Sequence, residues 1–135
     1  MNYSSTPSVP VEISNINHGF QEAKGLMKVK EDGLYLEFEV KDSFVGLITS
    51  GVRSAVISYA DLEDVRFEKG WWFGKIILEG MSMKVFEDLP GSEQGRVRFK
   101  VKRSDRDDAK NAVSSARVHL SEQKLKELDD ENTEE

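Results

Sequence analysis

The sequence predicts a mainly β domain with one C-terminal α-helix, in the form of a curved antiparallel sheet or small barrel that the helix caps. Three observations lead to this prediction. Most of the chain between residues 33 and 103 alternates apolar and polar side chains with the period of a strand. Short connections rich in turn-forming residues separate these stretches. After residue 104 the apolar residues recur at the spacing of a helix.

Seven segments have strand character. They are GLYLEFEVK (33–41), FVGLIT (44–49), SAVISY (54–59), DVRFEK (64–69), GWWFGKIILEG (70–80), SMKVFEDL (82–89) and RVRFKVKR (96–103). The clean alternation of 33–41 is typical of an antiparallel strand with one buried face. In 82–89 we expect the methionines and Val85 on one face and Phe86 on the other. In 96–103 we expect Val97, Phe99 and Val101 to face the core.

The C-terminal helix is expected to begin at Ser104, which is a favourable N-cap, with acidic residues in the first turn. One apolar stripe at helical spacing should then lie against the sheet. Its members are Ala109, Ala112, Val113, Ala116 and Leu120. Leu125 and Leu128 fall off this stripe and would carry the helix into solvent or toward a partner.

The chain has 135 residues, which is enough for one domain and too few for two. We expect a flexible leader over residues 1–18, with 9–13 as a loosely added edge segment, a domain over 19–120, and a helix end with an acidic disordered tail over 121–135. The tail holds seven acids and two lysines, so it carries −5 of the net charge of −6 and leaves the body nearly neutral. Acidic residues of the tail could therefore fold over the basic strand 96–103.

The composition narrows the classes of function. Without cysteine, the chain can form no disulfide and no thiolate metal site. No signal peptide and no membrane-spanning apolar run is visible, so a soluble cytoplasmic protein is the expectation. The two histidines, His18 and His119, lie about a hundred residues apart in no metal or triad spacing. We expect no enzyme, no cofactor and no metal site.

The order of elements resembles the pleckstrin-homology-like superfold, in its bacterial and GRAM-like versions. The segment ISYADLEDVRFEKGWWFGKIILEG (57–80) carries most of the likeness, through an apolar strand, an acidic corner and a glycine-aromatic turn. RVRFKVKRSDRDDAKNAV (96–113) is similar to the last strand and the capping helix of such domains. The resemblance covers residues 19–120 and implies a binding or scaffolding module without chemistry of its own. It carries over no site residue.

The basic strand has two interpretations. Its alternation places Arg96, Arg98, Lys100 and Lys102 on one side, at a spacing suited to phosphates of a lipid headgroup or a nucleic acid. Alternatively, the row is the solvated face of an ordinary strand, paired across strands with acids. The candidate acids are Glu37, Glu39, Glu79 and Glu87. We favour the solvated face. Among the phosphate ligands, nucleic acid is the least expected, because Phe99 points away from the basic row and cannot stack on a base.

The aromatic run predicts a contact surface. In an alternating strand Trp71, Trp72 and Phe73 cannot all enter one core, so at least one large ring should be exposed. Exposed tryptophan is typical of a protein hot spot or a membrane-interface anchor. Phe44 and Leu47 form a second, weaker candidate contact. We therefore expect a non-catalytic binding module that contacts a protein partner or its own copies, with peripheral binding to anionic lipid as the alternative.

Overall fold

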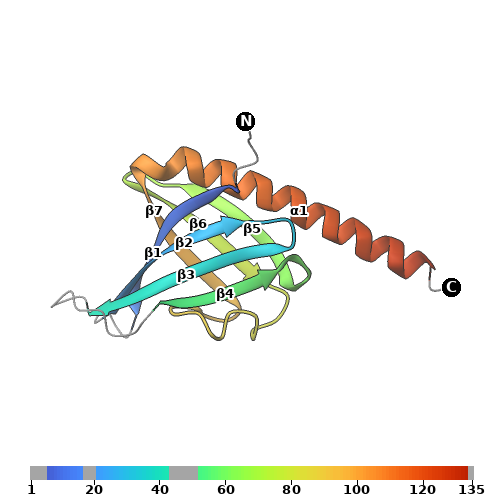
Figure 1. Ribbon diagram of the computed structural model, residues 1–135, viewed down its shortest axis with the longest axis horizontal. Coiled ribbons are helices and arrows are strands. Elements are labelled where there is room, and N and C mark those ends of the chain that lie inside the picture. The colour runs from blue at the N-terminus through green and yellow to red at the C-terminus, as the bar shows by residue number, and fades with distance from the viewer. Residues whose placement is uncertain (1–5, 17–20, 43–51, 134–135) are drawn as a thin grey trace.

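Figure 1 shows the computed structural model, which describes residues 6–16, 21–42 and 52–133. One seven-stranded antiparallel sheet and one long C-terminal helix account for its regular structure, which confirms the predicted fold class. The elements are β1 (Ser8–Ile16), β2 (Gln21–Val29), β3 (Gly33–Asp42), β4 (Arg53–Ser58), the 3-10 helix η1 (Tyr59–Asp61), β5 (Leu62–Lys69), β6 (Phe73–Gly80), β7 (Arg96–Lys102), the 3-10 helix η2 (Arg103–Asp105) and α1 (Arg106–Thr133).

The sheet is open rather than closed into a barrel. Its strand order is β4-β3-β2-β1-β7-β6-β5, so within the described residues β4 and β5 are the two edges. β1 joins the two halves: it pairs with β2 over residues 8–16, with a register shift after Ile13, and with β7 at Glu12 opposite Lys100. The ladder between β1 and β7 is therefore short, and the two halves of the sheet diverge from it.

The core lies between the inner face of the curved sheet and α1. The alternation of β7 buries Val97, Phe99 and Val101, as predicted, and the ring of Phe99 lies 5.6 Å from that of Phe38 on β3. The predicted alanine-rich stripe of α1 is buried, and α1 packs chiefly against β5. The helix crosses one end of the curved sheet and continues well beyond it (Figure 1).

The predicted leader is wrong, because residues 8–16 form a central strand instead of an edge. The side chains of Val9, Val11 and Ile13 are buried in the main core. These three apolar residues alternate with the period of a strand, and the strand lies between β2 and β7. Pro10 and the nearby polar residues had suggested a loose segment instead. The domain therefore begins no later than Ser8.

The predicted strand at 82–89 is also wrong. Backbone hydrogen bonds join Val85 to Ser82, Glu87 to Lys84 and Leu89 to Phe86, so the segment is a run of turns with a three-residue spacing. Phe86 and Leu89 are buried, whereas the two methionines are exposed. The apolar residues of this segment are compatible with a run of turns as well as with an alternating strand. The structure has the run of turns, with Phe86 packed into the core.

The two ends of α1 also differ from expectation. Ser104 lies inside η2, and α1 begins two residues later at Arg106. At the other end, α1 continues to Thr133, so the expected disordered tail is helical through most of its length. Leu125 and Leu128 are exposed, as their position off the buried stripe predicted.

Candidate functional site

The connection between β5 and β6 carries two exposed tryptophans. Trp71 and Trp72 lie in the turn and are 82% and 72% exposed, whereas Phe73 opens β6 and is partly buried. We call residues 70–73 the tryptophan tip. The sequence required at least one exposed ring, and the structure exposes both tryptophans because they precede the strand instead of alternating within it.

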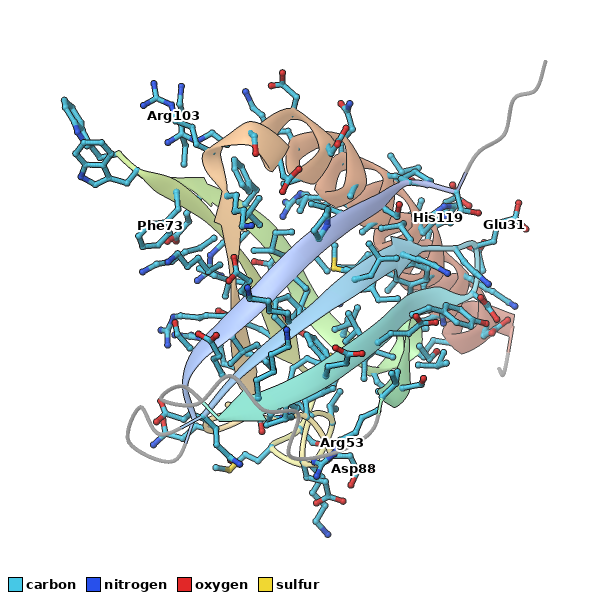
Figure 2. The ribbon with its side chains drawn as sticks, turned by 60° about the vertical axis from the view of Figure 1, so that its left-hand side comes forward. Glu31, Arg53, Phe73, Asp88, Arg103 and His119 are labelled. Carbon is cyan, nitrogen blue, oxygen red and sulfur yellow. The ribbon has the colours of Figure 1, made fainter. Side chains whose placement is uncertain are left out.

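The tip is held by the start of α1. Nη2 of Arg106 donates hydrogen bonds to the carbonyl oxygens of Gly70 and Trp71, the latter at 3.1 Å. Pairing of Phe73 with Lys102 on β7 fixes the other side of the hairpin. Figure 2 shows Phe73 and Arg103 at the same side of the molecule, where β7 passes into the helix. The two indole rings are therefore presented from an anchored backbone, which lowers the entropy lost on binding.

A small basic pocket of about 200 Å³ lies at the base of the tip. It is lined by Phe67, Lys69, Arg103, Ser104, Arg106, Asp107 and Lys110, so its charged side chains are four cations and one acid. Nε of Arg106 is buried and has no hydrogen-bond partner among the described residues. A buried guanidinium N–H without an acceptor is costly, and a carboxylate or phosphate oxygen would satisfy it.

The outward face of β7 carries the basic row in the predicted orientation. Arg96 is paired with Glu79 on β6, at 2.9 Å between Nη2 and Oε1. Glu37 and Glu39 do not pair with the basic row, because they belong to β3, which is not a neighbour of β7 in the sheet. Residues 121–133 do not cover the row, because they are helical and lead away from β7 (Figure 1).

An ion-pair network neutralises the Glu79 end of this face. Glu79 accepts from Arg66 at 2.8 Å, and Arg66 also contacts Asp64 at 3.1 Å and Glu68 at 3.6 Å. The hydrogen bond from Arg66 holds the pKa of Glu79 below its usual value, and the nearby positive charge of Arg96 adds to this effect. The same bond raises the pKa of Arg66.

The Phe73 end of the face is not neutralised in this way. Among the described residues, no carboxylate oxygen lies within ion-pair distance of Lys75, Arg98 or Lys100. Lys75 and Lys100 are directly opposite across β6 and β7, an arrangement that costs energy. The ammonium of Lys100 lies 4.7 Å from the centre of the Phe73 ring, within cation–π range.

These cations line a groove of about 610 Å³ at the divergence of β1 and β7. Glu12 and Glu93 also line it, so the groove is of mixed charge with an excess of cations. The loop at Gly91 closes one side, with a positive φ of 74° and so little room that a Cβ would lie 2.5 Å from Ile13. The groove and the tryptophan tip share Phe73 and form one continuous surface.

The remaining predicted residues lie outside this surface. Phe44, Leu47 and His18 lie outside the described residues. The ring of His119 stacks on Tyr59 at 5.5 Å, and burial raises the pKa of Tyr59 above its usual value. The described residues contain no group of three His, Asp or Glu side chains placed for a metal ion.

Sequence reasoning did not identify Lys69, Lys75, Arg106 and Lys110 as parts of this surface. Lys69 lies two residues before Trp71, which was a usable signal. Nothing local indicated that the start of α1 lies under the tip, since Arg106 contacts residues 35 and 36 positions earlier.

In the described part of the chain, no helix combines the length and apolar character needed to span a bilayer. The chain matches no protein-family model, no curated protein and no solved structure.

Proposed function

We propose that the chain is a non-catalytic binding or scaffolding module that contacts a protein through the tryptophan tip. The observation that carries this proposal is the exposure of two adjacent indole rings on an anchored hairpin. Exposed tryptophans cost hydration free energy in the unbound protein, and tryptophan is among the residues most enriched at binding hot spots.

We also propose that the fold is pleckstrin-homology-like. A seven-stranded antiparallel sheet with a C-terminal helix is compatible with that superfold, and the resemblance of residues 57–80 and 96–113 supports it. The fold alone does not specify a ligand, so the functional proposal depends on the tip and its surroundings.

Site-specific photo-crosslinking tests the proposed contact. A benzoylphenylalanine is placed at Trp72 of the full chain, in cells that express it, and at the exposed Val56 of β4 as control. We expect protein adducts from position 72 and few or none from position 56, because only the tip lies in the contact. Adducts identified by mass spectrometry should disappear when Trp71 is also changed to serine. Equal labelling from both positions would contradict the proposal.

A second candidate function is peripheral binding to an anionic membrane. It is favoured by the groove cations, which have no ion-pair partner among the described residues. The groove shares Phe73 with the tryptophan tip, and indole rings with neighbouring Lys and Arg suit the headgroup region of a bilayer. Of the predicted headgroup contacts, Arg96 is the least available, because it is already paired with Glu79.

Flotation with anionic and neutral liposomes tests this candidate. Membrane binding predicts salt-sensitive flotation with the anionic set only, lost in Arg98→Glu/Lys100→Glu. If the protein stays at the bottom of the gradient in every condition, membrane binding is contradicted, and a protein remains the expected partner of the tip.

A further inference from the structure

We propose that the tryptophan tip of one copy of the chain binds the outer ridge of α1 in another copy, head to tail. The outer ridge consists of Val118, Glu122, Leu125 and Leu128. This inference rests on the proposed function, because it names the partner of the same tip.

The outer ridge is apolar and acidic, and it lies away from the core. Val118 and Leu125 are seven residues apart, so they share the side of α1 opposite its buried stripe, and Leu128, three residues after Leu125, lies beside them on the flank of the helix. All three are exposed. Residues 121–131 contain five acids and two lysines, and Lys124 is paired with Glu63 at 3.7 Å. The surface around the leucines is therefore negative.

The tryptophan tip has the complementary composition. Its exposed indoles match the leucines of the ridge, and the pocket at its base, which Arg106 connects to the tip backbone, is lined by four cations. That pocket is large enough for a carboxylate, and the buried Nε of Arg106 lacks an acceptor within the described chain. Glu122, one turn from Leu125, would supply the carboxylate while the leucines cover the indoles.

The two surfaces cannot meet within one copy. α1 begins at the tip and leads away from it, and at 1.5 Å per residue Glu122 lies about 24 Å along the helix from Arg106. Figure 2 shows His119 of α1 on the opposite side of the molecule from Phe73 and Arg103. The complementary surface must therefore come from a second molecule.

Charge also disfavours symmetric pairing. Two tips would oppose their own cations, and two ridges would oppose their own carboxylates, whereas a tip and a ridge attract. One tip-to-ridge contact leaves a tip and a ridge unused. In the head-to-tail arrangement that we propose these bind further copies, whereas a reciprocal exchange of tip and ridge would stop at a two-fold dimer, so the size of the assembly distinguishes the two. The contact is small, and we expect a dissociation constant on the order of 10–100 μM.

Sedimentation velocity of the full chain tests the contact, at about 5 to about 500 μM protein and at about 50 and about 500 mM salt. The tip variant is Trp71→Ser/Trp72→Ser, and the ridge variant is Leu125→Ser/Leu128→Ser. The control is Val52→Ser/Val56→Ser on and beside β4, because these valines are 63% and 55% exposed, matching Leu125 at 62% and Leu128 at 55%. Circular dichroism confirms that each variant is folded.

We expect the wild type and the control to associate beyond dimers at low salt and to dissociate at high salt. The tip and ridge variants should each remain monomeric alone. Mixed together they should form a one-to-one heterodimer that grows no further, because each variant retains the surface that the other lacks.

The opposite results separate this inference from the proposed function. If the ridge variant associates like the wild type while the tip variant stays monomeric, the ridge is not the partner surface, and the tip is retained as a contact. Association of both variants like the wild type overturns the tip-to-ridge contact, and the proposed function then depends on photo-crosslinking from position 72. A wild type that is monomeric in every condition overturns the head-to-tail contact alone, since photo-crosslinking from position 72 still tests for another protein.

Discussion

The outer surface of β5, β6 and β7 has two ends that differ in how their charges are compensated. At one end Glu79 joins Arg66 and Arg96 in a network of ion pairs. At the other end Lys75, Arg98 and Lys100 have no such carboxylate among the described residues, and two tryptophans stand exposed beside them. The same strands thus carry one end whose charges are compensated by ion pairs and one end whose cations have no ion-pair partner among the described residues. The second end is where binding is expected.

The largest effect on stability is expected from a change in the core, beneath the outer surface of β7. Phe99→Ala removes a fully buried ring that packs against Phe38, so it should lower the free energy of unfolding by about 3–5 kcal/mol. Urea denaturation followed by circular dichroism measures this loss. Arg98→Ala, the neighbouring exposed position on the same strand, is the control and should change stability by less than about 0.5 kcal/mol. Equal losses in the two variants would contradict the assignment of the two faces of β7.

An intermediate effect is expected from the paired end. Glu79→Gln takes a carboxylate from both Arg66 and Arg96, and since the pairs are partly exposed we expect a loss of at most about 1 kcal/mol at neutral pH. The pKa of Glu79 is lowered in the folded state, so its contribution is present above the ordinary glutamate pKa and disappears as the pH falls through the lowered value.

Chemical denaturation of wild type and variant as a function of pH checks this expectation. The two stability curves should converge as the pH falls below about 4.5. Glu87→Gln changes an exposed acid outside the network and should leave the difference between pH 7 and pH 4 as in the wild type. A constant offset between wild type and Glu79→Gln at every pH would show that the carboxylate charge is not the cause.

The smallest effect on stability is expected from the unpaired end. Arg98→Ser/Lys100→Ser removes two cations without ion-pair partners in the described chain, so the free energy of unfolding should change by less than about 0.5 kcal/mol. Removing Lys100 relieves its repulsion of Lys75 and also removes its attraction to Glu12, so these two cross-strand contributions offset each other. Thermal denaturation at low salt measures the change. A loss as large as that of Glu79→Gln would mean that these cations are also part of the structural network.

Local sequence was sufficient for the features that depend on the period of one element. Alternation alone predicted the buried and basic faces of β7, and helical spacing predicted the buried stripe of α1 and the exposure of Leu125 and Leu128. It also required an exposed ring in the aromatic run. These predictions hold because a side chain's direction follows from its position within a strand or helix.

Tertiary structure alone decided which elements are neighbours. It placed β1 at the centre of the sheet, brought Glu79 between two arginines, and set Arg106 against the backbone of the tryptophan tip. It also folded 82–89 as turns, which bury Phe86 and Leu89 in the core. Such outcomes depend on contacts between residues far apart in the chain, and the period of a single segment holds no information about them.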